Sequence, residues 1–250
     1  KFKESILGQP QYADGIEKPR IATDCGSLPS ARAVSVAISP DVNVPDKYLT
    51  LLIMQFAQFL DHDLSQTSVT RGSNGTGIVC CKPEILKNPE LHHPACFEIV
   101  IPKNDPFFSQ FGETCMEFVR SAPAPRPGCT LGPREQLNQV TSFIDASNIY
   151  GSTEEQGKEL RRGINGLLSI SETGNTELLP PASDEECEIP NNNSSKYFCF
   201  KAGDERVNEQ INLALLHTIW MREHNRVARL LGYYNPGWND EILYQEARRV

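Results

Sequence analysis

The pattern of apolar and polar positions predicts two long amphipathic helices, over residues 46–64 and 208–231. In both segments apolar side chains recur near the 3.6-residue period of an α-helix, and Asp46 stands where a capping residue is expected. A third helix is predicted to begin at Asp240 and to reach Val250 without a stop signal, so we expect it to continue beyond this chain. The apolar positions are Leu51, Leu52, Phe56, Phe59 and Leu60 in the first helix and Ile211, Leu215, Ile219, Val227 and Leu230 in the second.

Less regular segments connect these helices. Residues 1–45 lack periodicity and are predicted to form an irregular arm, and residues 65–133 are rich in loops, with one short strand expected over 96–102. A helical turn is predicted over 134–140 and a short helix over 153–162, whereas 173–200 is interpreted as a polar loop. Without an internal repeat or a clear linker, the pattern predicts a single, mainly α domain over residues 1–250, with long loops and little β structure.

Composition narrows the class of protein. With 250 residues and 39% hydrophobic content the chain can bury a core, while 18 prolines and 17 glycines indicate many turns. The net charge of −8 argues against nucleic-acid binding, and no apolar run is long enough to span a membrane. The start lacks both a methionine and the apolar region of a signal peptide, so we expect a processed chain or a fragment.

The eight cysteines indicate disulfides rather than a metal site. None forms a Cys-x-x-Cys pair, so zinc-ribbon spacing is absent, and their even number and wide spacing are typical of an oxidising compartment. The stretch between Cys187 and Cys199 is hydrophilic and has little apolar surface to hold it, so a covalent tie between these two is expected. The further predicted pairings are Cys115 with Cys129, and Cys96 with either Cys80 or Cys81.

Glycosylation signals agree with that compartment. Asn-x-Ser/Thr acceptors occur at Asn74, Asn192 and Asn193, and they are typical of surface loops in secreted proteins. Together with the cysteines they predict a secreted, extracellular glycoprotein.

The first helix ends in the motif Gln58-Phe-Leu-Asp61-His62-Asp63. Three consecutive ionisable residues at the end of an apolar run are costly to bury unless each has a partner. On a helix successive side chains point about 100° apart, so one turn can serve three separate sites. A histidine between two carboxylates suggests acid–base chemistry beside a bound cofactor or ion.

Residues 141–147 offer oxygen atoms at alternate positions. Calcium prefers six to eight oxygen ligands including carboxylates, and this loop supplies only one carboxylate, so a second must come from elsewhere, with Asp63 as the candidate. The alternative interpretation is a turn rich in serine, threonine and aspartate between helices, which is the commoner case. The candidate oxygen donors of the loop are Thr141, the Phe143 carbonyl, Asp145 and Ser147.

Two further groups allow a structural and a functional interpretation. Arg206 and Glu209 are three residues apart and form either an exposed ion pair or a fixed positive charge beside a separately held carboxylate. His217 and His224 share one helix face, but their surroundings fit no zinc signature, so a buried hydrogen-bond network is favoured. His92 and His93 are expected on the surface.

In this order the motifs make the chain similar to the animal haem peroxidases, the superfamily of myeloperoxidase, peroxidasin and peroxinectin. The resemblance extends from about Leu28 to the end of the chain. It rests on Gln58-Phe-Leu-Asp-His-Asp63, Pro133-Arg-Glu-Gln-Leu-Asn138, Thr141-Ser-Phe-Ile-Asp-Ala-Ser147, Tyr150-Gly-Ser152, Ala202-Gly-Asp204, Arg206-Val-Asn-Glu209 and His217-Thr-Ile-Trp-Met-Arg-Glu-His-Asn-Arg226.

The resemblance implies a role for each motif residue. It implies that His62 is the distal histidine, Arg206 the distal arginine and Gln58 a residue that lines the distal cavity. Asp61 and Glu209 would be the carboxylates that can form ester bonds to haem b. The implied ligands of a structural calcium are Asp63, Thr141, Phe143, Asp145 and Ser147.

Two departures from the family pattern limit what the resemblance implies. Gln210 occupies the position at which myeloperoxidase has a methionine bonded to haem, so that third bond is excluded. The family's proximal histidine, the axial ligand of iron, lies beyond the end of this chain, because no histidine follows Arg226. The chain therefore resembles the distal, N-terminal part of the catalytic domain, and by itself it is expected to be inactive.

For the complete protein the resemblance implies reduction of hydrogen peroxide coupled to oxidation of a small reductant, either a halide or a phenol such as tyrosine. The rival hypothesis is an extracellular adhesion module on the same fold, with a matrix or cell-surface partner. The presence of His62, Arg206 and both ester carboxylates disfavours that alternative, and no Arg-Gly-Asp tripeptide occurs in the chain.

Overall fold

The computed structural model describes residues 12–130, 132–183 and 199–250. The chain divides into two compact units. One comprises Lys1–Pro45 and Thr67–Leu137, and the other comprises Asp46–Gln66 and Asn138–Val250. Both long helices and all the residues predicted to act on peroxide belong to the second unit.

The first unit consists mainly of loops with short helices. Its strands β1 (Ile99–Val100) and β2 (Cys115–Met116) pair in antiparallel fashion, with Val100 opposite Cys115. In α1 the hydroxyl of Ser30 caps the first turn by accepting a hydrogen bond from the backbone N–H of Arg32. The helices are α1 (Ala31–Ile38), α3 (Pro83–Lys87) and the 3₁₀ helices η1 (Pro89–Leu91), η2 (Phe108–Phe111) and η3 (Pro127–Cys129).

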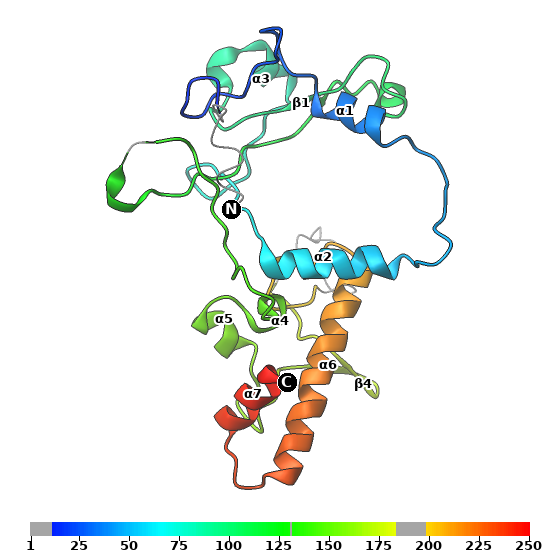
Figure 1. Ribbon diagram of the computed structural model, residues 1–250, viewed down its shortest axis with the longest axis vertical. Coiled ribbons are helices and arrows are strands. Elements are labelled where there is room, and N and C mark those ends of the chain that lie inside the picture. Colours follow the sequence, from blue (N-terminus) through cyan, green and yellow to red (C-terminus); the bar gives the residue numbers. More distant parts are fainter. Residues whose placement is uncertain (1–11, 131, 184–198) are drawn as a thin grey trace. The chain divides into compact units, whose positions relative to one another are not determined.

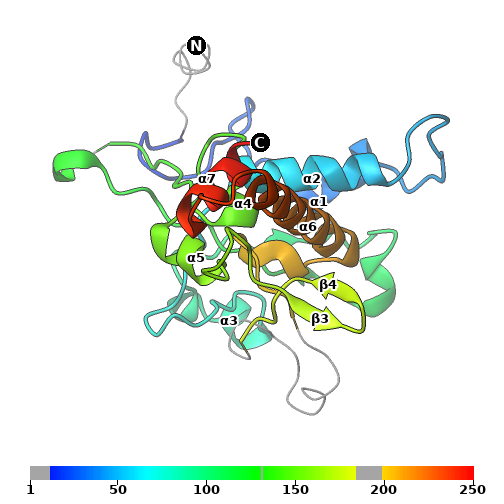
Figure 2. The same ribbon diagram turned by 90° about the horizontal axis from the view of Figure 1, so that it is seen from below.

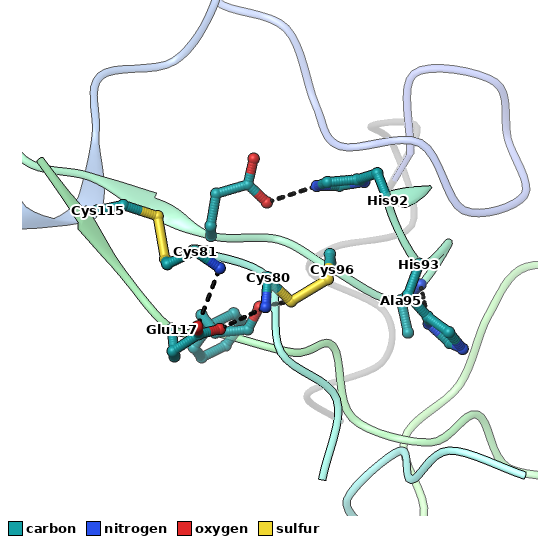
Figure 3. The surroundings of a disulfide bond; sticks show 10 residues. Cys80, Cys81, His92, His93, Ala95, Cys96, Cys115 and Glu117 are labelled. Carbon is teal, nitrogen blue, oxygen red and sulfur yellow. Dashed lines mark hydrogen bonds and ion pairs between the residues drawn. A yellow bond between two sulfur atoms is a disulfide. The ribbon is translucent and has the colours of Figure 1, made fainter. Parts of the chain in front are cut away.

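Two disulfides hold this unit together (Figure 3). Cys80 pairs with Cys96 and Cys81 pairs with Cys115, closing loops with sequence separations of 16 and 34 residues. Chain-entropy arguments give about 3 and about 4 kcal/mol for loops of these lengths. The carboxylate of Glu117 accepts hydrogen bonds from the backbone N–H groups of both Cys80 (2.7 Å) and Cys81 (2.9 Å), which fixes the adjacent cysteines between their partners.

The predicted pairing of Cys115 with Cys129 is therefore wrong, whereas Cys96 pairs with Cys80, one of the two partners predicted for it. Antiparallel pairing places Cys115 opposite Val100, close to where Cys81 lies, and Cys129 is a free, exposed thiol. Cys81 is held beside Cys115 by Glu117, which accepts a hydrogen bond from the Cys81 backbone N–H. Cys199 takes part in a disulfide, while Cys187 lies outside the described residues, so their pairing stays a prediction.

The second unit is built around one long helix, α6 (Ile211–Tyr234). Helix α2 (Leu52–Leu64) lies across the N-terminal end of α6, and α7 (Asp240–Arg249) packs beside its C-terminal half (Figure 1). The short helix α4 (Ser147–Tyr150) contacts both α2 and α6. The remaining elements are α5 (Glu154–Glu159), the 3₁₀ helix η4 (Glu205–Asn208) and the hairpin of β3 (Ser171–Thr173) and β4 (Thr176–Leu178), which Figure 2 shows clearly.

The core of this unit lies where α2, α4, α6 and α7 meet. Helix α6 contributes the most apolar side chains to it, whereas α2 contributes only Phe59 and α4 contributes Ile149 and Tyr150. Truncation of a large core side chain to alanine typically costs about 2–5 kcal/mol. The buried core residues are Phe59, Ile149, Tyr150, Leu160, Leu168, Leu179, Val207, Leu213, Ala214, Leu216, Met221 and Tyr244.

The structure confirms the three main helices and corrects several boundaries. The first helix begins at Leu52 and not at Asp46, because the Asp46 carboxylate accepts hydrogen bonds from Tyr48 and Leu49 N–H in a preceding turn. The second begins at Ile211, after the separate η4 turn. The short helix α5 has Thr153 as its N-cap in a capping box with Gln156.

Three predictions about the loops are wrong. The arm over residues 1–45 contains α1, whose apolar face was too short to stand out from its surroundings. The segment 134–140 is not helical, because it is extended and pairs with neighbouring chain: Gln136 bridges Pro123, and the Leu137 carbonyl accepts from Ser68 N–H. The region predicted as a polar loop from residue 173 opens with the β3–β4 hairpin.

Candidate functional site

The last turn of α2 sends its three ionisable side chains in three directions, as its helical spacing predicts. Asp61 is exposed and accepts a hydrogen bond from the Ser65 hydroxyl at 3.0 Å. His62 is 5% exposed and Asp63 2% exposed, and the Asp63 side chain is turned toward α4. Each residue of the motif thus has its own surroundings.

His62, in the last turn of α2, contacts the η4 segment. Its Nε2 atom is 3.9 Å from a carboxylate oxygen of Glu209, and its backbone carbonyl accepts a hydrogen bond from Nη2 of Arg206 at 3.2 Å. Its Nδ1 atom is buried and has no hydrogen-bond partner among the described residues. Burial, followed by the positive charge of Arg206, lowers the pKa of His62, so the imidazole is held in its neutral form near neutral pH.

A chain of amides fixes the side chain of Gln58. Its Nε2 donates to Glu209 at 2.7 Å, and its Oε1 accepts from Gln210 at 2.6 Å and from Gln55 at 2.9 Å. Because a carboxylate can only accept hydrogen bonds, Glu209 determines which end of each amide faces the next. Gln58, His62 and Glu209 therefore converge from two distant segments of the chain.

Arg206 is held by Asp204 and not by Glu209. Its Nε donates to Oδ1 of Asp204 at 2.8 Å and its Nη2 donates to Oδ2 at 2.6 Å. The interpretation of Arg206 and Glu209 as an exposed ion pair is therefore wrong, while the alternative, a fixed cation beside a separately held carboxylate, agrees with the geometry. Asp204 was not among the site residues predicted from the sequence. The Asp-x-Arg spacing at the start of a helical turn, in which aspartate commonly caps the backbone, was the available signal.

Four of the five predicted calcium ligands, Asp63, Thr141, Asp145 and Ser147, also come together. The Asp63 carboxylate accepts from the Ser147 hydroxyl at 3.0 Å and from the Ala146 backbone N–H at 3.0 Å. The Asp145 carboxylate accepts from the Thr141 hydroxyl at 2.8 Å and from the Ser147 backbone N–H at 3.1 Å. Ser147 thus joins the two carboxylates, which belong to segments far apart in the sequence.

The donors in this cluster are all oxygen atoms, which suits a hard cation such as calcium. Only two carboxylates contribute, and the described residues contain no group of three or more histidine, cysteine or acidic side chains placed to hold a metal. Phe143 is 74% exposed, and none of the hydrogen bonds that join the other four predicted ligands involves its backbone carbonyl.

The histidines of α6 are structural, as predicted. His224 is buried, with Nδ1 at 2.9 Å from the Tyr150 hydroxyl and Nε2 at 2.8 Å from the Gly166 carbonyl oxygen. His217 is fully buried against Phe59, and its Nδ1 lies 2.8 Å from the Leu213 carbonyl oxygen.

We expect His217 to make the stability of the protein depend on pH. Burial lowers its pKa from 6.5 to about 4, so between these values the unfolded chain binds a proton that the native state does not. The contribution of neutral His217 to the free energy of unfolding should therefore be complete above pH 6.5. It should decrease by about 3 kcal/mol as the pH falls toward 4, for a shift of this size.

Urea unfolding of the wild type and of His217→Gln across pH 4–7 measures this contribution. The variant should show a shallower decrease, and His93→Gln is the control, because an exposed side chain changes its surroundings little on unfolding. Parallel curves for the wild type and His217→Gln would contradict the assignment.

The predicted glycosylation sites lie partly within the described residues. Asn74 is exposed in a turn, where an acceptor would be accessible, whereas Asn192 and Asn193 lie outside the described residues. Among the described residues, no helix is long and apolar enough to cross a membrane.

Comparison with known proteins shows the family to which the chain belongs. A sequence model of the animal haem peroxidase family matches residues 4–250, and the chain belongs to this family. It is 44% identical over 246 residues to the chorion peroxidase of Aedes aegypti, covering 97% of this chain and 30% of that protein. It is also 40% identical over 240 residues to the human peroxidasin homolog, covering 90% of this chain and 16% of that protein. With human myeloperoxidase it shares 38% identity over 257 residues, covering 96% of this chain and 33% of that protein.

Solved structures show the same fold. Peroxidase A from Dictyostelium discoideum aligns with a TM-score of 0.69 at 24% identity, over 97% of this chain and 44% of that chain. A fatty acid alpha-dioxygenase from Arabidopsis thaliana aligns with a TM-score of 0.55 at 22% identity, over 82% of this chain and 25% of that chain. The chain spans about a third or less of the curated relatives described above.

Proposed function

We propose that the protein containing this chain is a haem-dependent peroxidase, which reduces hydrogen peroxide while oxidising a small reductant. The observation that carries the proposal is the convergence of Gln58, His62, Arg206 and Glu209, from α2 and from the segment before α6, on one end of the second unit. Membership of the animal haem peroxidase family supports it.

The residues present fit a haem group. His62 has a neutral imidazole beside a fixed guanidinium, the pair of groups that peroxide cleavage requires. Asp61 is exposed, and the Glu209 side chain is 51% exposed, so either carboxylate can reach a group outside the helices. In this proposal Gln58 lines the distal cavity, and Asp61 and Glu209 hold haem b, which supplies the redox chemistry when bound.

The protein's own part in the reaction is proton transfer and charge stabilisation. Neutral His62 takes the proton from peroxide and returns it to the departing oxygen, acting first as a general base and then as a general acid. Arg206 stabilises the negative charge that develops as the O–O bond lengthens, and because it is fixed before the reaction, little reorganisation is needed.

A structural calcium ion is the second part of the proposal. Asp63, Thr141, the Phe143 carbonyl, Asp145 and Ser147 would hold it, supported by the all-oxygen donor set and by the links through Ser147. Because Asp63 follows His62 directly, the ion would fix the backbone from which the imidazole projects.

The remaining proposals concern reductant and location. A halide or a phenol such as tyrosine would be the reductant, and the protein would be secreted, which the disulfides and the exposed Asn74 support. An adhesion module with a matrix or cell-surface partner is not favoured, because the groups for peroxide cleavage are retained.

Absorbance spectroscopy of the full-length protein tests the main proposal. The protein as purified should show a Soret band, and peroxide should shift that band until an added reductant restores it. A protein without a Soret band, or with one that peroxide leaves unchanged, would refute the peroxidase assignment.

A further inference from the structure

Asp204 is a buried carboxylate in the second unit with no role in the proposed reaction. Its side chain has no exposed surface, whereas that of Arg206 is 20% exposed. The side chain of Arg206 donates two hydrogen bonds to it, and the backbone N–H of Arg206 donates a third at 2.8 Å. Since a buried charge is costly unless it is paired, these contacts explain how the carboxylate is tolerated.

The hydrogen bonds of the guanidinium decide which of its nitrogens is left for chemistry. Arginine has five N–H groups in a rigid fork. Asp204 and the His62 carbonyl occupy Nε and Nη2, and the guanidinium makes no hydrogen bond through Nη1 among the described residues. Asp204 therefore determines which edge of the guanidinium remains available.

The backbone before Asp204 is fixed as well. A Cβ atom on Gly203 would lie 2.4 Å from the Ser147 carbonyl oxygen and 2.4 Å from the Gly151 nitrogen, so only glycine allows this close approach to α4. Ser147 in turn contacts Asp63, the neighbour of His62. The same short helix thus locates both Asp204 and the end of α2.

We propose that Asp204 is a positioning residue for the reaction: its carboxylate grips Nε and Nη2 of Arg206 so that Nη1 faces the peroxide beside His62. This inference rests on the proposed function, in which Arg206 stabilises the separating oxygens. Asp204 touches neither peroxide nor haem, and it acts only through Arg206.

Asp204→Asn in the full-length, haem-loaded protein tests the proposal. Asparagine can still cap the backbone N–H of Arg206, but it loses the charge and turns one acceptor into a donor that faces the guanidinium. We expect the rate of peroxide cleavage per haem to fall about tenfold to a hundredfold, which is typical when a residue that orients an active-site group is replaced. The rate of oxidation of the reductant should stay unchanged. Fluoride should bind to the haem more weakly, because the same guanidinium edge would stabilise that anion.

Asp105→Asn is the matched control. Asp105 is 1% exposed in its side chain and grips Nε and Nη2 of Arg32, which is 21% exposed, in the first unit. The chemistry and the burial of the two pairs are nearly the same, so both variants should lose stability. Only Asp204→Asn should slow peroxide cleavage and weaken fluoride binding.

A double-mutant cycle separates this inference from the proposed function. Lysine cannot reproduce the fork of arginine, so Arg206→Lys alone should slow peroxide cleavage, and adding Asp204→Asn should slow it little further. Fully additive effects, or a normal rate in Asp204→Asn beside a slow Arg206→Lys, would overturn the positioning role. A normal rate in Arg206→Lys would instead refute the proposed function itself.

Asp204→Ser serves if the asparagine variant does not bind haem, because serine keeps the backbone cap in a smaller side chain. If both variants lost haem while Asp105→Asn retained it, Asp204 would have a purely structural role and the proposal would be wrong.

Discussion

Replacing His62 with alanine in the full-length protein is expected to leave haem bound but to slow peroxide cleavage by ~10²–10⁴-fold, the usual loss for an acid–base group. The reason is geometric: His62 has a buried, neutral imidazole with Nε2 near Glu209, and its backbone carbonyl accepts a hydrogen bond from Arg206, a combination that no other histidine in the described part of the chain has. Stopped-flow measurement of the first change in the Soret band after mixing with peroxide gives the rate.

His92→Ala is the control for that measurement. His92 lies in the first unit, where its Nε2 is 2.9 Å from Glu98, so it forms a histidine–carboxylate contact with no part in the candidate site. It should react with peroxide at the wild-type rate. A wild-type rate of peroxide cleavage in His62→Ala would refute the proposed acid–base role of His62.

Asp145→Ala is expected to impair both haem incorporation and peroxide turnover, although Asp145 lies in the oxygen cluster and not beside His62. Asp63 and Asp145 are both bound to Ser147, and two carboxylates brought this close repel each other without a cation. A calcium ion bound by both carboxylates would cancel that repulsion and hold α2 to the loop before α4. Its loss should loosen the backbone of the adjacent His62.

Removal of calcium should also lower peroxide turnover, as Asp145→Ala does. A ligand that binds only the folded state raises the melting temperature, and at a hundredfold excess over its dissociation constant it contributes about 2.7 kcal/mol. Chelation should therefore lower the melting temperature and turnover of the wild type, whereas Asp145→Ala should respond little. Asp24→Ala, which removes an exposed carboxylate that accepts one backbone N–H, is the control and should respond like the wild type. If chelation changed neither quantity in the wild type, the proposed calcium site would be wrong.

The sequence by itself determined the helices and the identity of most candidate residues. The recurrence of apolar side chains every three or four positions located α2 and α6, because this spacing follows from helix geometry. The start of α7 was located at Asp240. Helical spacing also predicted that Asp61, His62 and Asp63 point in three directions, since this depends only on the local backbone. His224 was correctly assigned to a buried network from its polar neighbours on an apolar helix.

Only the tertiary structure decided which residues are partners. Cys115 pairs with Cys81, whose backbone N–H donates to Glu117 two residues beyond Cys115, and no spacing of cysteines reveals this. The pairing of Asp204 with Arg206 is local, but the contact of Arg206 Nη2 with the His62 carbonyl oxygen joins η4 to α2 across 144 residues, and no pattern in the sequence indicated it. The predicted apolar positions Ile211, Leu215 and Ile219 of α6 are exposed, so the period located the helix but not its buried face. Partners are set by packing between elements far apart in the chain, and this is why the local pattern determined the elements and left their contacts open.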